Sequence, residues 1–518
     1  MGINDLQKLN PLKEASAKPQ TWLMAGLLLL LLGMVLVLRY QVFNELSMHY
    51  VDSDQPFMWA GAMDYASGIF YEPRFYGQNY NTFFEALVAV PFIWLGMPVY
   101  KALPLATQIL FVFPFVFAAV YLFVVGKKPA ALWVLCILLC MPTAFDIMSS
   151  LPRGFVGGIF FCSFFILSFH QPNNRFYLAI NYSLLVIGYF VNPNSVLISL
   201  PFLLYVYAFH FRQKFFYYLS ALMLLLFVLL NYVFDGFYQR HPEYVIYGYA
   251  HSFSWQFFIE NIKHLDQTLG YVGFLSEGRS VVFLLTLAFM LYYLWRHNLR
   301  AFWAFVVFLL VMLLSFFSGK SRDGVVWPWY AYSRLFIGAP MVFYLFIGIF
   351  KFKGIRLTLL LVTLSVFFSG YKYTQFNTNL KRLTDEKLWN GVHLVSMPSV
   401  LDAVKLYHGV CDKNGVDFLL ISNGFWLNTF LDYGGPAIDP HFPQTYETRA
   451  ERRQWVRKKM DDKIVKRFVF ISAIYDFDQK VQGAFQLKRL DDYGLYLVEN
   501  NSLSTKQFIA LANKTELN

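Results

Sequence analysis

The chain has 518 residues, of which 57% are hydrophobic and only 14% are charged, and its mean hydropathy is +0.44. A soluble protein of this length needs more charge, so the composition excludes an ordinary soluble globular protein. The formal charge of +11 lies mainly in short loops between apolar runs. This is the positive-inside pattern of membrane proteins, so no nucleic-acid partner is expected.

The apolar runs predict eleven membrane-spanning helices. Their expected ranges are 21–39, 105–126, 130–146, 154–170, 176–191, 196–211, 214–234, 280–296, 300–318, 330–350 and 355–372. We interpret the first as an uncleaved helix, because it is too long for a signal-peptide core and no small-residue cleavage site follows it.

The basic connectors predict the topology. Lysines and arginines gather in the loops on the side of the basic N-terminus, which is therefore expected to be cytoplasmic in an integral inner-membrane protein. The longer loops, at about 40–104, 235–279 and 319–329, then lie on the extracytoplasmic face. The run Thr82 to Gly96 is expected to lie on or dip into that face, because counting it as a crossing would invert every later loop.

The chain changes character after residue 372. Alternating apolar stretches predict strands at Asp417–Ser422, Arg467–Ser472 and Tyr493–Val498, and the charged stretch Thr445–Lys463 predicts a helix. The predicted fold is therefore a polytopic α-helical membrane domain, residues 1–372, followed by a small extracytoplasmic α/β domain, residues 373–518. Three of the four cysteines lie in apolar runs and Cys411 stands alone, so no disulfide framework or metal-ligand spacing is present.

Two aspartates follow the first apolar run by about fifteen residues. A carboxylate at this depth can meet both lipid-borne and aqueous reactants, and it could act as a general base or bind a metal. Asp54 is the stronger functional candidate, and Asp52 is evenly balanced between function and structure. Asp64 and Glu72 in the same loop are expected only to keep the loop hydrated. The spacing His241, His251 and His264 fits no common metal-ligand motif.

The first extracytoplasmic loop resembles that of a known group of enzymes. The resemblance lies in Asp54-Gln55, then Phe75 to Tyr80, then Phe84 to Pro91 followed by Leu95-Gly96, and it extends to Ser150 to Gly154 and Tyr332 to Arg334. These segments are similar to the membrane-embedded glycosyltransferases of the C-type (GT-C) fold, which use polyprenyl-phosphate sugars. That superfamily includes bacterial protein O-mannosyltransferases and the lipid A aminoarabinose transferase.

The sequence departs from the usual motifs at two places. Many members carry an Asp-Glu pair where this chain has Asp54-Gln55, so either Asp54 acts alone or Asp52 supplies the second carboxylate. The late Arg-Tyr reads Arg334-Leu335, which keeps a charge for phosphate and removes the aromatic hydroxyl.

The resemblance implies an inverting glycosyltransferase. Asp54, or Asp52, would be the catalytic base toward a hydroxyl on a glycan, lipid or protein acceptor, and the donor would be a polyprenyl-phosphate sugar. The resemblance implies substrate-binding roles for Arg153, Arg334, Tyr76, Gln78, Tyr80 and Glu85, with the two arginines facing the phosphate. The resemblance implies no particular cofactor, and a divalent cation stays open. No metal ligands are assigned.

Other functions are weaker fits to the sequence. The main alternative is a transporter or flippase of lipid-linked sugars or polysaccharides, which usually carries charged or broken helices at mid-membrane. The predicted central helices are nearly free of charge and show no repeat, which favours the enzyme. A ligase acting on lipid-linked sugars would need a larger late loop than 319–329, and a non-catalytic assembly protein stays open.

Overall fold

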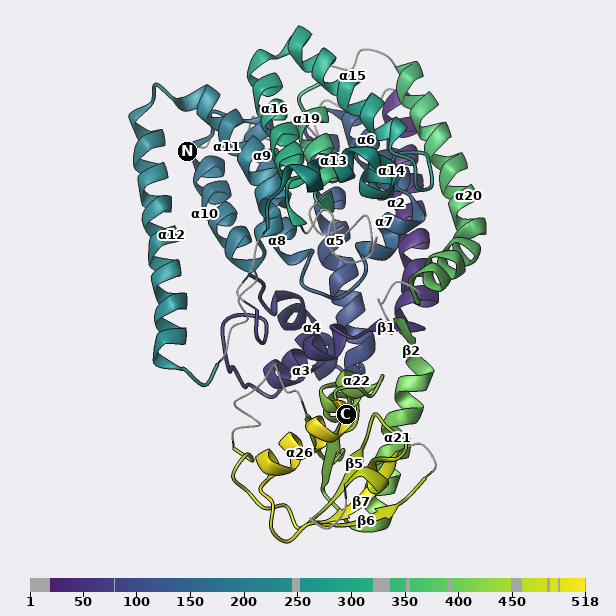
Figure 1. Ribbon diagram of the computed structural model, residues 1–518. Helices are drawn as coiled ribbons and strands as arrows, with labels where there is room; N and C mark the ends of the chain where they lie inside the picture. Colours follow the sequence, from purple (N-terminus) through teal and green to yellow (C-terminus); the bar gives the residue numbers. More distant parts are fainter. Residues whose placement is uncertain are drawn as a thin grey trace.

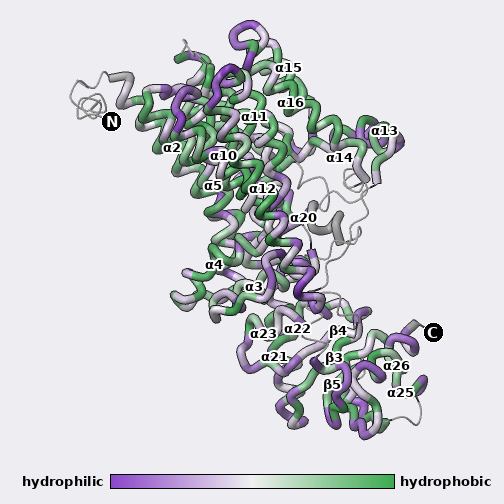
Figure 2. The backbone as a smooth tube through the Cα atoms, turned by 90° about the vertical axis from the view of Figure 1, so that its left-hand side faces the viewer, coloured by the Kyte–Doolittle hydropathy of each residue, from purple (hydrophilic) through white to green (hydrophobic). Residues whose placement is uncertain are grey.

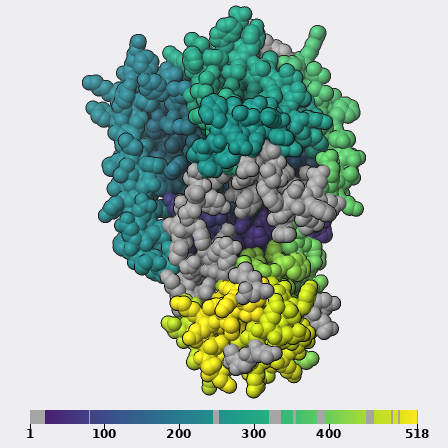
Figure 3. Space-filling model, in the orientation of Figure 1, coloured from purple at the N-terminus to yellow at the C-terminus, as the bar shows by residue number. Residues whose placement is uncertain are grey.

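The computed structural model divides the chain into a large helical part and a smaller part built on a sheet (Figure 1). It describes residues 19–78, 80–244, 252–319, 336–350, 355–388, 394–448, 459–481, 485–491 and 494–517. The C-terminal residues form a compact body at one end of the helical part (Figure 3). The predicted fold class, a helical membrane protein with a small α/β region near its C-terminus, is confirmed.

Apolar helices make up the first part of the chain. They are α2 (Pro19–Val42), α5 (Val99–Val124), α6 (Lys128–Leu139), α8 (Gly157–Phe161), α9 (Phe165–His170), α10 (Arg175–Val191), α11 (Val196–His210), α12 (Lys214–Arg240), α15 (Val281–His297), α16 (Leu299–Ser315), α19 (Ala339–Ile347) and α20 (Ile355–Leu388). Shorter helices lie between them, namely α3 (Gln55–Ala66), α4 (Phe84–Trp94), α7 (Thr143–Met148), α13 (Trp255–Lys263) and α14 (Leu265–Leu269).

The outward faces of these helices are apolar, which indicates a lipid environment. In the described residues, four helical segments, which cover α2, α5, α12 and most of α20, are long and apolar enough to cross a bilayer, and in α12 only 11% of the most apolar window is buried. Trp22, Leu29 and Tyr232 are 69–76% exposed. Most of the chain in the helical part consists of hydrophobic residues, whereas hydrophobic and hydrophilic residues alternate in the sheet part (Figure 2). A helix that is apolar all round and uncovered by protein is stable only against lipid.

Several predicted helices differ from the observed ones in their ends. The run predicted over 130–146 divides into α6 and α7 at Cys140–Pro142, and the run over 154–170 begins at Gly157 and contains a tighter turn at Cys162–Phe164. The last predicted crossing does not end at residue 372, because α20 continues to Leu388. The segment Thr82–Gly96 contains the 11-residue α4, about half the length that a crossing needs.

The C-terminal part is an α/β unit. Its sheet has the order β4-β3-β5-β7-β6, in which β4, β3 and β5 are parallel and β7 and β6 are antiparallel. The strands are β3 (Phe418–Ile421), β4 (Gln444–Glu447), β5 (Arg467–Ile471), β6 (Gln486–Arg489) and β7 (Leu495–Glu499). The helices are α21 (Met397–Asn414), α22 (Asn428–Asp432), α23 (Gly434–Ile438), α25 (Phe477–Lys480) and α26 (Thr505–Leu517).

The three predicted strands of this domain are confirmed as β3, β5 and β7. The predicted helix at Thr445–Lys463 is wrong at its start, because Thr445 to Glu447 pair with β3 as strand β4. Residues 449–458 of that segment lie outside the described residues. The exposed strand β6 was not predicted, because its sequence, Gln-Leu-Lys-Arg, has no continuous apolar face.

The sheet part packs against the loop after α2 and against α3. Strand β1 (Tyr50–Asp52) pairs antiparallel with β2 (Leu394–Ser396), so the segment after α20 holds the segment before α3. The ring of Phe57 in α3 lies 4.1 Å from that of Tyr433, between centroids. The loop that carries both candidate aspartates is therefore held between the two parts of the molecule.

Candidate functional site

Asp52 and Asp54 occupy the start of α3 in different ways. Asp54 is the residue before the helix, but its carboxylate does not cap it. Instead Asp52 Oδ1 accepts hydrogen bonds from the backbone N–H groups of Asp54 (2.9 Å) and Gln55 (3.2 Å). Asp52 thus satisfies the helix N-terminus, a role that favours a carboxylate, and leaves the Asp54 side chain to point elsewhere.

Arg153 contacts both aspartates. Its Nη1 lies 3.4 Å from Asp52 Oδ2, and its Nη2 donates a hydrogen bond to Asp54 Oδ2. The side chains of Arg153 and Asp52 are 4% and 3% exposed, whereas that of Asp54 is 15% exposed. Asp54 is therefore the member of this group that an incoming molecule can reach most easily.

Burial controls the ionisation of Asp52. Removal from water raises the pKa of its carboxyl above the ordinary value, and the neighbouring Asp54 charge raises it further. The Arg153 charge and the two backbone hydrogen bonds oppose this shift without cancelling it.

A tight turn between α7 and α8 presents Arg153. Gly154 has a φ of +79°, and a Cβ there would lie 2.4 Å from the Asn81 side chain. Asn81 Nδ2 donates to the Arg153 carbonyl (3.0 Å), and Asn192 Nδ2 donates to the Gly154 carbonyl (2.8 Å). Glycine is needed because it adopts this left-handed conformation without strain and leaves room for the amide.

Glu85 supports the same turn and lies at a different place from the one expected. The resemblance implied a substrate-binding role, yet Glu85 is completely buried. Its carboxylate accepts hydrogen bonds from the Val156 backbone N–H (3.1 Å) and the Thr107 hydroxyl (2.9 Å). Since α4 lies beside α5, this carboxylate ties the Arg153 turn to both helices, and it contacts the protein rather than an open surface.

Some residues of the Phe75–Tyr80 segment are packed in the protein core, and others could contact a bound molecule. Tyr76 is buried, and its hydroxyl donates to Asp64 Oδ2, so it too contacts the protein. The side-chain oxygen of Gln78 is buried and accepts no hydrogen bond from any described residue, and the buried Nε2 of Gln55 donates none to a described residue. Buried amides in this state are candidates for contact with a bound molecule. Tyr80 is half-buried.

The same loop holds a buried carboxylate that was expected to be hydrated. Glu72 is 1% exposed and accepts a hydrogen bond from the Tyr238 hydroxyl of α12 (2.9 Å). Burial raises the pKa of the Glu72 carboxyl to about 7. Nearby, the guanidinium of Arg74 lies 4.9 Å from the centroid of the Phe234 ring in α12. These two contacts fasten the far end of α12 to the loop.

A second buried charge group joins α2, α7 and α20, and sequence reasoning missed it. Asp146 lies between two cations, with Oδ1 3.1 Å from Arg39 Nη2 and Oδ2 2.6 Å from Lys372 Nζ. Arg39 Nη1 also donates to Ser149 Oγ (2.8 Å), four residues before Arg153. The three charged residues stand at the ends of three predicted crossings that the topology placed on one face, and that coincidence was the available signal.

Arg334, together with residues 320–335 as a whole, lies outside the described residues. In the described ranges, no three histidine, cysteine, aspartate or glutamate side chains converge as a set able to hold a metal ion. His241 pairs with Glu243 at 3.1 Å, and both are about 40–45% exposed.

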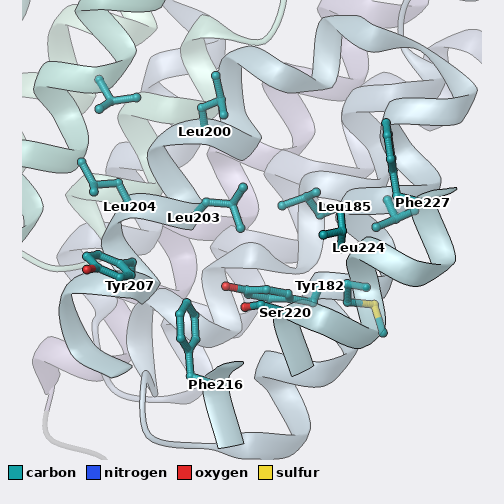
Figure 4. Close-up of a pocket in the computed structure, with 13 residues that line it drawn as sticks. Tyr182, Leu185, Leu200, Leu203, Leu204, Tyr207, Phe216, Ser220, Leu224 and Phe227 are labelled. Atoms are coloured by element: carbon teal, nitrogen blue, oxygen red, sulfur yellow. The ribbon is translucent and has the colours of Figure 1, made fainter. Parts of the chain in front are cut away.

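The helical part also contains an apolar cavity of about 580 Å³. Side chains of α10, α11 and α12 line most of it (Figure 4), including Leu185, Leu203, Leu224 and Phe227, and Val307 of α16 lines the rest. The residues around it carry no charge, and Tyr182, Tyr207 and Ser220 supply its hydroxyl groups. Such a lining suits a hydrocarbon chain.

The helical bundle, the loop with its buried aspartates and the α/β unit together define an integral membrane protein of the GT-C fold. Its structure is similar to the crystal structure of ArnT from Cupriavidus metallidurans in the apo state, with a TM-score of 0.54 and 12% identity over 92% of this chain and 98% of that chain. ArnT is an aminoarabinose transferase.

The crystal structure of the same ArnT bound to undecaprenyl phosphate gives a TM-score of 0.48 with 14% identity, again over 92% of this chain and 98% of that chain. No protein-family model and no curated protein sequence matches the chain. At 12% identity, the likeness to ArnT establishes a shared fold.

Proposed function

We propose that the chain is an inverting glycosyltransferase that moves a sugar from a polyprenyl-phosphate donor to an acceptor hydroxyl on the extracytoplasmic face. The proposal rests mainly on the position of Asp54. Its carboxylate is partly exposed, although it contacts Arg153, which is buried together with Asp52. A base that receives a proton during transfer must be reachable from the substrate side. Of the two aspartates, Asp54 has the more exposed side chain.

In the proposed chemical step one proton moves, one bond forms and one bond breaks. The acceptor oxygen forms a bond to the anomeric carbon while its proton moves to an Asp54 carboxylate oxygen. The bond between the anomeric carbon and the phosphate oxygen breaks, and its electron pair leaves with the lipid phosphate. Attack from the face opposite the leaving group inverts the anomeric centre.

The contacts of Arg153 suggest how donor binding prepares the base. Nη2 of Arg153 contacts Asp54 in this structure, whereas Nη1 faces Asp52. In the proposal, the donor phosphate replaces Asp54 at Nη2, because a guanidinium binds phosphate oxygens strongly. Asp54 then turns to the acceptor hydroxyl, while Asp52 keeps α3 and the guanidinium in place.

The supporting residues have matching roles in this proposal. Asp52, Glu85 and Asn81 are positioning residues, since each acts on the start of α3 or on the Arg153 turn. Gln78 and Gln55 offer amide groups to the sugar, and Arg334 is proposed as a second phosphate contact. The similarity of the fold to that of ArnT supports this reaction class.

The test uses purified protein in lipid nanodiscs with a labelled polyprenyl-phosphate sugar. We expect Asp54→Asn to lower the transfer rate by about 10²–10⁴-fold, the usual contribution of a general base. Asp402→Asn, which changes an exposed aspartate of α21, should leave the rate unchanged. Equal rates in the wild type and in a folded Asp54→Asn protein would rule out the assignment.

A transporter of lipid-linked sugars is the alternative function. The buried group of Arg39, Asp146 and Lys372 favours it, because charges buried between helices are common in transporters. Release of polyprenyl phosphate distinguishes the two functions. An enzyme releases polyprenyl phosphate in detergent when it receives an acceptor, whereas a transporter leaves the donor intact and moves it only across a closed membrane.

A further inference from the structure

The parallel part of the C-terminal sheet holds a carboxylate between two of its strand ends. Ser422 directly follows β3 and Ser472 directly follows β5, which is its parallel neighbour. Glu516 of α26 reaches both. Its Oε2 accepts from Ser422 Oγ, and its Oε1 accepts from Ser472 Oγ (2.8 Å) and the backbone N–H of Ala473 (3.0 Å).

The position of this carboxylate in the topology is significant. After β3 the chain turns to β4 on one side of the sheet, and after β5 it continues to β6 and β7 on the other side. The crevice between the carboxyl ends of two parallel strands with diverging connections is where open α/β sheets bind ligands. Glu516 therefore occupies the place of a ligand with a group from the same chain.

The two strand-end loops form a surface that can receive more than a carboxylate. They touch each other, since a Cβ on Gly424 would lie 2.7 Å from Ala473 Cβ. Each loop exposes one aromatic ring, with Trp426 62% exposed and Tyr475 64% exposed. Asn423, Gly424 and Ala473 are exposed too, so the loops that follow Ser422 and Ser472 face solvent.

We infer that this crevice binds the carboxylate of an acidic sugar, a uronic acid, for which Glu516 is an internal substitute. The two serine hydroxyls and the Ala473 N–H hold both oxygens of one planar carboxylate, and an aromatic ring beside them stacks on the apolar face of a sugar ring. The site lies on the sheet domain and involves no residue of the Asp54 group, so it stands independently of the proposed transfer.

Occupation by Glu516 gives the site a distinctive behaviour. A carboxylate on the same chain competes at a high effective concentration, so the wild type binds an external carboxylate weakly. Removal of the Glu516 carboxylate should strengthen binding. α26 remains docked without it, because Phe508, Ile509 and Ala512 are buried against the sheet domain.

The experiment measures galacturonate binding to the full chain in nanodiscs by calorimetry, with galactose as the neutral control. We expect Glu516→Ala to bind galacturonate at least about tenfold more tightly than the wild type. The reason is that the variant lacks the Glu516 carboxylate, which competes for the same charge-assisted hydrogen bonds. Adding Ser472→Ala to that variant should reverse the gain. Asp402→Ala, which removes an exposed carboxylate of α21, should bind as the wild type does.

Three results would overturn the inference. They are no gain in a folded Glu516→Ala protein, equally tight binding of galactose, and equally tight binding of inorganic phosphate. If Glu516→Ala fails to fold, Glu516→Gln keeps the shape of the side chain and removes its charge. That variant should still bind galacturonate more tightly than the wild type, and an unchanged affinity would contradict the site.

Discussion

The molecule contains two buried charge groups with opposite compositions. Around Arg153, two carboxylates share one cation, and Asp54 is 15% exposed. Around Asp146, two cations share one carboxylate, and the three side chains are at most 7% exposed. A closed group holds helices together, whereas a group with one reachable member can exchange partners. The exposure of one carboxylate, more than the balance of charges, therefore distinguishes the proposed chemical site from the closed group.

The two groups are also connected in the chain. Asp146 and Ser149, both contacts of Arg39, precede Arg153 by seven and four residues. The closed group therefore fixes the segment from which the Arg153 turn begins. We regard it as a clamp that positions the site without contacting the substrate.

The clamp is tested most strongly by Asp146→Asn. The change leaves two cations buried without their carboxylate, and breaking a buried ion pair in this way costs about 3–5 kcal/mol. We expect a large fall in the free energy of unfolding, measured in detergent with denaturant. Asp402→Asn is the matched control. If Asp146→Asn keeps wild-type stability and abolishes transfer, the closed group is part of the chemistry and the comparison fails.

Asp52→Asn should have a smaller effect than Asp54→Asn. Asparagine can still accept a backbone hydrogen bond at the start of α3 but loses the charge toward Arg153, so we expect a loss of stability of about 1 kcal/mol. Transfer should fall by no more than about tenfold, since Asp52 is not the base in the proposal. Rate and stability are measured on the same preparation. A larger loss of rate for Asp52→Asn than for Asp54→Asn would indicate that Asp52 is the base and Asp54 the positioning residue.

Glu72 gives a prediction for pH. Its pKa is about 7 in the folded protein, whereas the ordinary pKa of a glutamate carboxyl is 4.5, so the folded state retains the proton over that interval. The unfolded state then binds fewer protons, and stability falls as pH rises from about 4.5 to about 7 before levelling off. Glu72→Gln keeps an acceptor for Tyr238 and should remove this part of the fall. Thermal unfolding at several pH values would show the same slope in both proteins if the burial of Glu72 had no such effect.

The smallest expected effect concerns the apolar cavity. Leu203→Phe narrows the space among α10, α11 and α12, which we propose accepts part of a lipid chain. The KM for a long-chain polyprenyl donor should rise by about two- to fivefold, and that for a short-chain analogue should not change. A rise of the same size for both donors would place the lipid elsewhere.

The sequence was sufficient to predict the helical membrane class and three strands of the α/β unit. Long apolar runs and alternating patterns are local signals, so they can be read without knowing what lies beside them. The resemblance singled out Asp54 and Arg153 separately, and no local pattern predicts that these residues, which are 99 residues apart, contact each other. The structure brings these two predicted residues together.

The remaining features depend on contacts that no local pattern records. Arg39 and Lys372 each look like a charge at the end of a helix, and their pairing with Asp146 requires three helices to meet. The resemblance implied that Glu85 contacts the substrate, yet its partners are the Thr107 hydroxyl and a backbone N–H group of a distant turn. The carboxylates of Asp52 and Glu516 both accept hydrogen bonds from backbone N–H groups, at the start of helix α3 and after strand β5 respectively.

The central claim is that Asp54 accepts the proton of the acceptor hydroxyl. The most direct measurement gives Asp54→Ala protein the polyprenyl-phosphate sugar together with azide, a nucleophile that carries no proton to remove. We predict that the variant forms a glycosyl azide of inverted configuration while it fails to use the hydroxyl acceptor. A variant that is inactive toward azide as well, although folded and able to bind the donor, would contradict the assignment of Asp54 as the base.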